Sequence, residues 1–536
     1  MKKMTFNQLL GLMATVGLMV ISSATQVLAF NPVSIGNTEL NAYGFLRNNY
    51  GYFLEDQDYA NNDDSKLATN RTWLRLNVDY RMSDSFSLFA VGQLAYEPEY
   101  DIEEGSVSQE DGKEYSEYDD IDDTLREAYF DWRPSSGHSF RVGRQIVIWG
   151  ESVTTKVGDV VNPEDTRYTF AFANQEDTRI PQWMVKGLHD FQGIATSFEW
   201  LVSPLLTGKE YRVNRTGEFA IPGSGEFVGQ RFGIHPEDRF LPPNAVGNPA
   251  LGPQAGAVSA SPFSRGWIFN PFAPGTGWVP TEIPNVIHKY PEQGMEDARY
   301  GFRTSTFLGG YEFGVSYFHT QEYLPLTKRS DETFPSGLPA PAPATIRNYY
   351  LVHPDVDYYG VYFNKDIPVG LLRAEAVYAP GRSFNTFDLS ETDAITERDY
   401  YKYMIAWDIN GLLYFDWHKS APFDITLEHV GEYIPDNEDI QDGIYAHEKD
   451  QYNPSVSARI STNWFYNLLS TEVIMTYEFN SGSGFVMPVI KWTPTWWDKA
   501  FSAELRYVNI FGDNDYEGLG ILQKKDLVVL TTQFNF

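Results

Sequence analysis

The chain has 536 residues and no cysteine, so disulfides do not contribute to its stability. Its formal net charge of −31 at pH 7 makes it strongly acidic, which argues against nucleic acid as a partner. Aromatic residues make up 15% of the chain, an excess that the two aromatic girdles of a membrane β-barrel would explain; a large soluble sugar-binding protein is the alternative.

The first 29 residues have the pattern of a secretory signal peptide. Lys2 and Lys3 precede an apolar stretch from Leu9 to Ile21, and small and polar residues follow up to Ala29. The apolar stretch is shorter than the about 20 residues that a membrane-spanning helix needs. We therefore expect export, removal of residues 1–29 and a mature protein of residues 30–536. No later stretch has the length and apolar character of a transmembrane helix, in keeping with a mean hydropathy of −0.37.

The mature chain alternates between apolar and polar side chains in successive runs, as β-strands do. In residues 70–82 one face is apolar, whereas the other carries Arg71, Arg75 and Arg81. Most runs have the roughly ten-residue length of a transmembrane β-strand, and short links alternate with long ones between them. The pattern predicts an all-β fold, a transmembrane antiparallel β-barrel of about 18 strands with 16 as the alternative count. A soluble all-β exported protein is the competing interpretation.

The long links are expected on the extracellular side and the short turns on the periplasmic side. The link 97–123 is rich in carboxylates that could bind calcium, but its spacing does not match an EF-hand, so a solvated acidic loop is favoured. The link 207–297 is rich in glycine, proline and aromatic residues, which predicts a constriction in the lumen, a lid over the mouth or an adhesive loop. Its candidate anchors are Trp267, Phe269, Phe272 and Trp278.

Residues 141–152, with the sequence RVGRQIVIWGES, read as a strand that continues through Trp149. In that strand Arg141, Gly143, Gln145 and Trp149 would face the lumen. Arg144 would then face lipid, which costs about 2–4 kcal/mol at the bilayer midplane and much less near an interface. A bulge, or a position high in the strand, would remove the conflict.

The same segment and the following GDVVNPED at residues 158–165 resemble the signature of the outer-membrane family catalogued as domain of unknown function 1302. The early segment YGFLRNNYGY at residues 43–52 is also similar to that family. The residues that carry the signature are Gly143, Arg144, Gln145, Trp149, Gly150, Glu151, Asp159, Asn162, Pro163 and Asp165. The resemblance implies a Gram-negative outer-membrane protein and movement of hydrophobic or amphiphilic compounds with an inner-membrane efflux system and a periplasmic partner. Outer-membrane lipids and the barrel-assembly machinery are the other expected partners.

Several arginines are expected on the inner wall of the barrel, where they could bind or steer anionic groups. The alternative, slightly favoured, is an interior lattice of salt bridges with Asp79, Glu127 and Asp131 on neighbouring strands. The candidate lumen residues are Arg47, Arg71, Arg75, Arg81, Arg141, Gln145 and Trp149.

No motif of an enzyme is present: the chain lacks the nucleophile elbow, the zinc-protease helix motif, the P-loop and the dinucleotide-binding fingerprint. Its nine histidines are scattered, with none at metal-ligand spacing, so we expect neither a catalytic site nor a cofactor. An outer-membrane lipid hydrolase assembled from neighbouring strands is the least favoured alternative.

The last run, VVLTTQFNF at residues 528–536, alternates as a strand, and in a closed barrel it would pair with the first strand. Phe534 and Phe536 would then face lipid near the periplasmic rim. A terminal phenylalanine after such a strand resembles the recognition signal of barrel-assembly substrates. The favoured function is a membrane channel or transporter, and the alternative is a surface-binding or structural barrel that acts through its long loops.

Overall fold

The computed structural model describes most of the strands and part of the links between them. The described residues are 33–35, 38–54, 67–96, 124–164, 175–206, 267–269, 278–280, 286–323, 326–329, 349–386, 388, 391, 393–440, 449–495, 500–513, 518–522 and 526–536.

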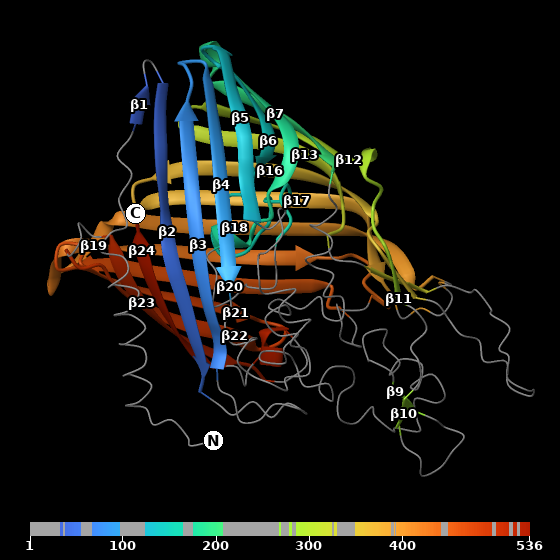
Figure 1. The fold of residues 1–536 in the computed structure, drawn as a ribbon. Helices are drawn as coiled ribbons and strands as arrows, with labels where there is room; N and C mark the ends of the chain where they lie inside the picture. The colour runs from blue at the N-terminus through green and yellow to red at the C-terminus, as the bar shows by residue number, and fades with distance from the viewer. Residues whose placement is uncertain are drawn as a thin grey trace, which may run out of the picture.

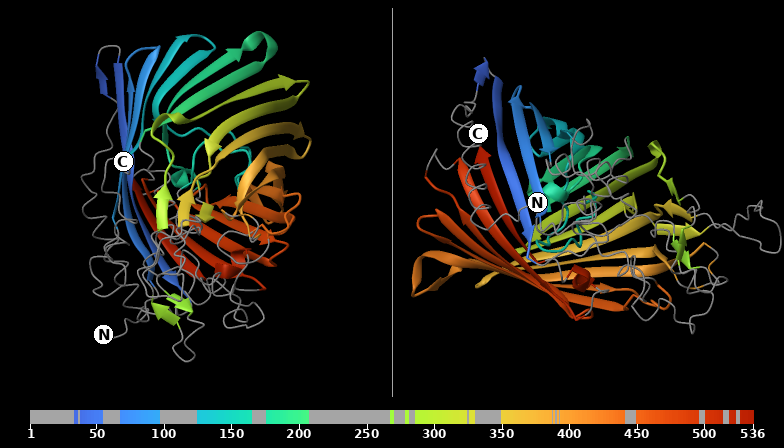
Figure 2. Two further views of the ribbon diagram at one scale, coloured as in Figure 1. Left: turned by 90° about the vertical axis from the view of Figure 1, so that its right-hand side faces the viewer. Right: turned by 60° about the horizontal axis from the view of Figure 1, so that its bottom comes forward.

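Eighteen antiparallel strands form one closed sheet, which curves around an interior (Figures 1 and 2). Each strand pairs with the next one around the barrel, and the last pairs with the first. The barrel strands are β2 (Thr38–Phe53), β3 (Leu67–Arg81), β4 (Phe86–Tyr96), β5 (Leu125–Ser135), β6 (His138–Gln145), β7 (Gln182–Phe191), β8 (Thr196–Leu205), β12 (Gly294–Leu308), β13 (Tyr311–Gln321), β16 (Asp355–Ile367), β17 (Gly370–Asn385), β18 (Ile395–Phe415), β19 (His418–Tyr433), β20 (Tyr452–Trp464), β21 (Leu469–Glu478), β22 (Ser483–Trp492), β23 (Phe501–Phe511) and β24 (Leu527–Asn535). The predicted transmembrane β-barrel of about 18 strands is therefore confirmed.

Short elements accompany the barrel in the described links. They are β1 (Val33–Ile35), which pairs with β2, the paired β9 (Trp267–Phe269) and β10 (Trp278–Pro280), the small sheet of β11 (Val286–Lys289), β14 (Leu326–Arg329) and β15 (Tyr349–Val352), and the helical turns α5 (Gln175–Thr178), η2 (Gln192–Ile194) and η5 (Gly518–Leu522). None of the helical segments among the described residues has the length and apolar character needed to cross a membrane.

The barrel closes where β24 meets β2, in a register that runs from Phe45 opposite Asn535 to Phe53 opposite Leu527. Phe536 extends this ladder, because its backbone exchanges hydrogen bonds of 2.8 and 3.0 Å with that of Gly44. Only glycine fits at position 44, since a Cβ atom there would lie 2.1 Å from the Arg75 carbonyl oxygen. The final residue is therefore held along the sheet like any other strand residue.

Short turns lie at one end of the barrel, which by the rule for such barrels is the periplasmic end. Between β12 and β13, Gly309 and Gly310 have φ angles of 61° and 80°, the conformation that a two-residue hairpin turn requires. The turn expected to be oversized, between β18 and β19, is short, because Phe415 and His418 still pair across the two strands. Aromatic contacts of Trp417 with Phe415 and Trp464 stabilise this extension.

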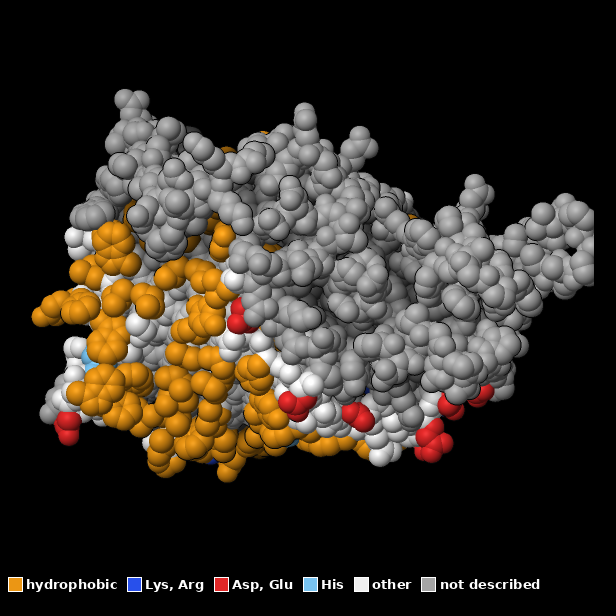
Figure 3. All heavy atoms as spheres, turned by 90° about the horizontal axis from the view of Figure 1, so that it is seen from below, with side chains coloured by type: hydrophobic (Ala, Val, Ile, Leu, Met, Phe, Trp, Pro, Cys, Tyr) orange, Lys and Arg blue, Asp and Glu red, His pale blue; other side chains and the backbone are white. Residues whose placement is uncertain are grey.

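The outward side chains are apolar, as a lipid-facing surface requires. Leu74 and Leu76 on β3 are exposed, whereas the alternate residues Arg71 and Trp73 are buried. Hydrophobic side chains cover a broad part of the described surface in Figure 3. The alternation of apolar outward and polar inward residues identifies a β-barrel of the outer-membrane type.

Candidate functional site

The link between β6 and β7 comprises residues 146–181, and its described residues fold into the barrel; we call this link the strap. The strand that was expected to continue to Trp149 ends at Gln145, and the structure describes the strap at 146–164 and 175–181. Asn162 joins its two ends, because its Oδ1 accepts a hydrogen bond of 2.7 Å from the Val147 N–H and its Nδ2 donates one of 2.9 Å to the Ile180 carbonyl. The strap therefore leaves the wall and returns to it at one point.

The first part of the strap, which leaves the wall after β6 and which we call the outgoing limb, packs on the inner wall formed by β7, β8 and β13. Trp149 donates a hydrogen bond of 2.5 Å from Nε1 to Glu199, and its ring lies edge-on to Phe318 with centroids 5.7 Å apart. Both rings belong to one buried apolar cluster, whose members are Val147, Trp149, Val161, Met184, Leu201 and Phe318. Trp149 thus lies in the lumen, as expected, although it belongs to the strap and not to a strand.

The tip of the strap binds the wall across the barrel, at β17 and β19. Between β6 and β17 lie β7, β8, β12, β13 and β16. The backbone N–H groups of residues 151 and 152 donate to the carboxylate of Glu375, at 2.8 and 3.2 Å. Those of residues 153 and 154 donate to the carboxylate of Glu428, at 2.8 and 2.9 Å. Four consecutive backbone N–H groups therefore bind two carboxylates of the wall, and we call this contact the clasp.

The two carboxylates are only 4% and 3% exposed, so they need partners at their depth. Arg373 supplies one for Glu428 at 3.4 Å, while it also binds Asp408 at 2.5 Å. The strap supplies the other hydrogen-bond partners of Glu375 and Glu428. Beside the clasp, Val157 of the strap packs into an apolar patch of the wall made of Val377, Met404, Ala406 and Val430.

The glycines of the strap permit this close approach. A Cβ atom at Gly158 would lie 2.8 Å from the Glu375 carboxylate, and one at Gly150 would lie 2.6 Å from the Asp159 backbone nitrogen. The Glu151 side chain points to another part of the wall, where its oxygens accept hydrogen bonds from Arg303 at 2.9 Å and Asn364 at 3.3 Å.

The second half of the signature, which begins at Asp159, holds the last part of the strap, where the chain returns to the wall before β7. We call this part the returning limb. Arg179 binds the Asp159 carboxylate at 2.8 Å, and the Ile180 N–H donates to the Pro163 carbonyl at 2.9 Å. With Asn162, these residues fix the strap to itself. Asp165 lies outside the described residues.

The returning limb also reaches the wall formed by β2, β3 and β5. In α5, the Asp177 carboxylate binds Arg47 at 2.9 Å and Arg75 at 2.8 Å, and its backbone carbonyl accepts a hydrogen bond from Arg126. Burial by itself would raise the pKa of Asp177, but the charges of Arg75, Arg47 and Arg126 outweigh burial and hold that pKa below its usual range. The sequence did not indicate this contact.

The arginines of this wall lie on aromatic faces. The Arg47 and Arg75 guanidinium carbons lie 4.4 and 5.1 Å from the Phe45 ring centroid, and that of Arg141 lies 3.8 Å from the Tyr129 ring. Arg141 also binds Asp131, one of the three acids expected in the lattice, at 2.7 Å. Arg71, only 1% exposed, lies over the Trp73 ring at 4.3 Å.

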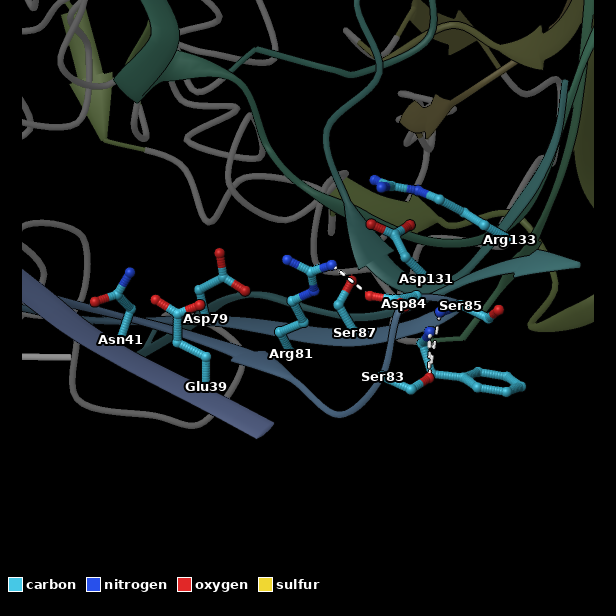
Figure 4. Close-up of a pocket in the computed structure, with 11 residues that line it drawn as sticks. Glu39, Asn41, Asp79, Arg81, Ser83, Asp84, Ser85, Ser87, Asp131 and Arg133 are labelled. Atoms are coloured by element: carbon cyan, nitrogen blue, oxygen red, sulfur yellow. Dashed lines mark hydrogen bonds and ion pairs between the residues drawn. The ribbon is translucent and has the colours of Figure 1, made fainter. Parts of the chain in front are cut away.

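A cavity of about 320 Å³ lies at the periplasmic ends of β2–β5, on the periplasmic side of these arginines (Figure 4). Arg81 lines it and binds Asp84 in the adjoining turn at 2.7 Å. The other charged residues that line it are Glu39, Asp79, Asp131 and Arg133. The cavity thus presents both signs of charge.

Gln145 and Arg144 lie at the extracellular end of β6. Gln145 is buried and donates a hydrogen bond of 3.1 Å to the Met184 carbonyl. Arg144 lies opposite Trp183 and Ala128, on the outward side, but it is only 7% exposed and is the penultimate residue of the strand. The position high in the strand is therefore the alternative that the structure supports, and the midplane cost does not arise.

The remaining candidates lie mostly beyond the described part of the chain. Phe272 and the acidic link 97–123 fall outside it, and of Trp267, Phe269 and Trp278 only the backbone, in the β9–β10 pair, is described. The described residues contain no cluster of three or more side chains that could hold a metal ion. Phe534 faces outward opposite Leu46, and the Phe536 ring lies against Gly44.

Comparison with protein families finds a match between residues 11–536 and the family described as Protein of unknown function (DUF1302). No curated protein matches the chain.

Among solved structures, the Salmonella typhi OmpF complex with daunomycin has 10% identity and a TM-score of 0.38, with 94% of this chain and 100% of that chain covered. Acinetobacter baumannii OccAB3 has 8% identity and a TM-score of 0.43, with 94% and 100% covered. Pseudomonas aeruginosa OccK2 in complex with glucuronate has 7% identity and a TM-score of 0.43, with 93% and 98% covered. With TM-scores this low, the fold assignment rests on the strand pairing of this chain.

Proposed function

The chain belongs to the family described as Protein of unknown function (DUF1302), and we propose that it is an outer-membrane channel whose bore is set by the strap. The observation that carries the proposal is the docking of the strap on both sides of the lumen, at Glu375 and Glu428 and again at Arg47 and Arg75. A link held in the lumen at both places narrows the space that a solute can use. For residues 207–297, most of which lie outside the described part of the chain, a constriction, a lid or an adhesive loop stays a prediction.

The solutes that fit this wall are amphiphilic anions. The side chains of Arg47, Arg75 and Arg141 are 14%, 15% and 26% exposed, so they are accessible from the lumen despite their ion pairs. Because each guanidinium lies on an aromatic ring, the wall offers positive charge and apolar surface at the same place. A carboxylate with an apolar body would contact both.

We extend the proposal to the route of export and the partners. Residues 1–29 act as a signal peptide, and the channel works in a Gram-negative envelope with an inner-membrane efflux system and a periplasmic partner. The support for the partners is the family resemblance alone, so the test is cross-linking followed by co-purification from whole envelopes. Recovery of the barrel without any inner-membrane transporter would remove this extension and leave the channel proposal in place.

The alternatives have less support. No feature of the described residues favours a lipid hydrolase, and the long loops on which a surface-binding role would depend lie largely outside those residues.

Ion selectivity tests the channel. In a planar bilayer with a salt gradient, we expect the wild-type reversal potential to show a preference for anions, because arginines in a confined lumen are less screened than on an open surface. Arg75→Glu should shift the reversal potential toward cations, and Arg75→Gln should shift it less in the same direction.

The matched control is Arg398→Glu, which changes a half-buried arginine that binds the Asp436 carbonyl at the extracellular end of β18. Heat-dependent migration on gels shows whether each variant is a folded barrel. If folded Arg75→Glu has the selectivity of the wild type, the arginines are a structural lattice and do not steer ions. If the folded wild-type barrel conducts no ions, the bore is sealed and the channel proposal fails.

A further inference from the structure

The outward face of β17–β22 carries an apolar groove of about 520 Å³. Two neighbouring rows of paired residues form it. One row is Leu372, Trp407, Leu427, Ala458, Met475 and Val486, and each residue lies opposite the next. The next row begins with Ile405, His429, Val456 and Tyr477.

The groove faces lipid and not the lumen. Its rows alternate along the strands with Glu428, whose carboxylate binds the strap inside the barrel. Ile405 and Leu427 are 54% and 42% exposed, as expected for side chains on the outer surface. Ala458 sits between larger neighbours, and its small side chain leaves the hollow.

A polar cluster borders this groove on the extracellular side. The Tyr403 hydroxyl lies 3.1 Å from His429 Nε2 and 2.6 Å from the Tyr452 hydroxyl, and His429 Nδ1 lies 3.0 Å from the Ser455 carbonyl oxygen. Gly431 leaves room for it, because a Cβ atom there would lie 2.4 Å from the Tyr403 ring. Tyr452 is the first residue of β20, so the cluster reaches the extracellular rim.

The hydrogen-bond chemistry of the cluster follows from its partners. A carbonyl can only accept, so His429 Nδ1 donates to the Ser455 carbonyl, and Nε2 is placed to accept from the Tyr403 hydroxyl. The Tyr452 hydroxyl then donates to the Tyr403 oxygen. The two tyrosine hydroxyls and the His429 Nδ1–H therefore donate to partners within the cluster. A ligand can still donate a hydrogen bond to the lone pairs of the tyrosine oxygens.

We propose that the groove and the cluster together bind one molecule of the outer-leaflet glycolipid, lipopolysaccharide. One acyl chain lies in the groove over Ala458, and a sugar hydroxyl or amide N–H of the head group donates to the oxygens of Tyr452 and Tyr403. The depth of the two parts fits, since the groove lies within the sheet and the cluster lies at its extracellular rim. A head group without hydrogen-bond donors would find no partner there.

Native mass spectrometry of the purified full-length barrel, titrated with the lipid A portion of lipopolysaccharide, measures this binding. Ala458→Phe fills the groove, and Ala90→Phe is the matched control because Ala90 also faces outward, between Val78 and Ala128. Tyr452→Phe removes one hydroxyl, and Tyr359→Phe is its control at an exposed tyrosine of the same surface.

We expect each of the two site variants to weaken lipid A binding roughly tenfold, which corresponds to the loss of one hydrogen bond or of part of an apolar contact. The controls should bind as the wild type does. Equal binding by all four variants overturns the proposal. So does a loss confined to a phosphatidylethanolamine titration, because that result would assign the site to a phospholipid.

If Ala458→Phe does not fold, Tyr452→Phe decides alone, since its ring is retained. The groove lies outside the barrel, so a sealed bore would end the proposed channel without affecting this site.

Discussion

The strap should loosen when Glu428 is replaced by glutamine, which keeps the shape of the side chain and removes its charge. Glu428 Oε1 accepts from the Val153 N–H and Oε2 from the Thr154 N–H, at 2.8 and 2.9 Å. The amide of glutamine has one oxygen, and its NH₂ group cannot accept. In either orientation of the amide, one of the two backbone donors therefore loses its acceptor.

The size of the effect follows from that orphaned donor. Leaving a buried N–H without an acceptor costs about 1–3 kcal/mol. Val153 is 39% exposed and Thr154 is half-buried, so at either position water can partly replace the lost acceptor, and we take the lower half of this range, about 1–2 kcal/mol. The ratio of docked to undocked strap should then fall by a factor of roughly 5 to 30.

Single-channel recording in planar bilayers measures this ratio through the fraction of time that the channel spends at the lower and at the higher conductance level. Glu428→Gln should show more frequent steps and a larger time-averaged conductance than the wild type. Glu472→Gln is the control, because Glu472 binds Arg459 on the wall at 2.9 Å and the structure shows no contact between this pair and the described part of the strap. If Glu428→Gln and Glu472→Gln give the same traces as the wild type, the clasp does not hold the strap in the lumen.

Three further outcomes are expected. The protein should fractionate with outer membranes and migrate differently on gels before and after boiling, and recovery as a soluble periplasmic protein would contradict the membrane assignment. Phe536→Ser should lower the amount of assembled barrel, because the ring that lies against Gly44 is lost, while single-channel conductance stays unchanged; normal membrane levels would show that the ring only packs. The pKa of Asp177 is depressed, so its ion pairs with Arg47 and Arg75 persist at neutral pH and are lost only as the pH falls through that lowered pKa. Conductance noise should therefore be flat from pH 7 to about pH 5, and a rise near pH 6 would refute this role of Asp177.

The alternation of apolar and polar residues along each strand determined the barrel fold. Alternation along a strand fixes which side chains face lipid, and it needs no knowledge of the partner strand. The inward side of Arg47, Arg75 and Arg141 and the outward side of Phe534 followed in the same way. The pattern misjudged the segment after Gln145, because an apolar run that docks inside a barrel alternates much like one that spans the wall.

Only the tertiary structure showed what the signature does. Glycines 150 and 158, Asn162 and Asp159 shape a strap, but the carboxylates that hold it lie far along the chain. The backbone of Glu151 binds a residue 224 positions away, and that of Val153 binds one 275 positions away. Closure of the sheet brings β17 and β19 opposite β6, and no periodicity within a strand encodes that distance. Glu375, Glu428 and Asp177 therefore read as ordinary acids in the sequence, and they become the anchors of the strap only in the closed barrel.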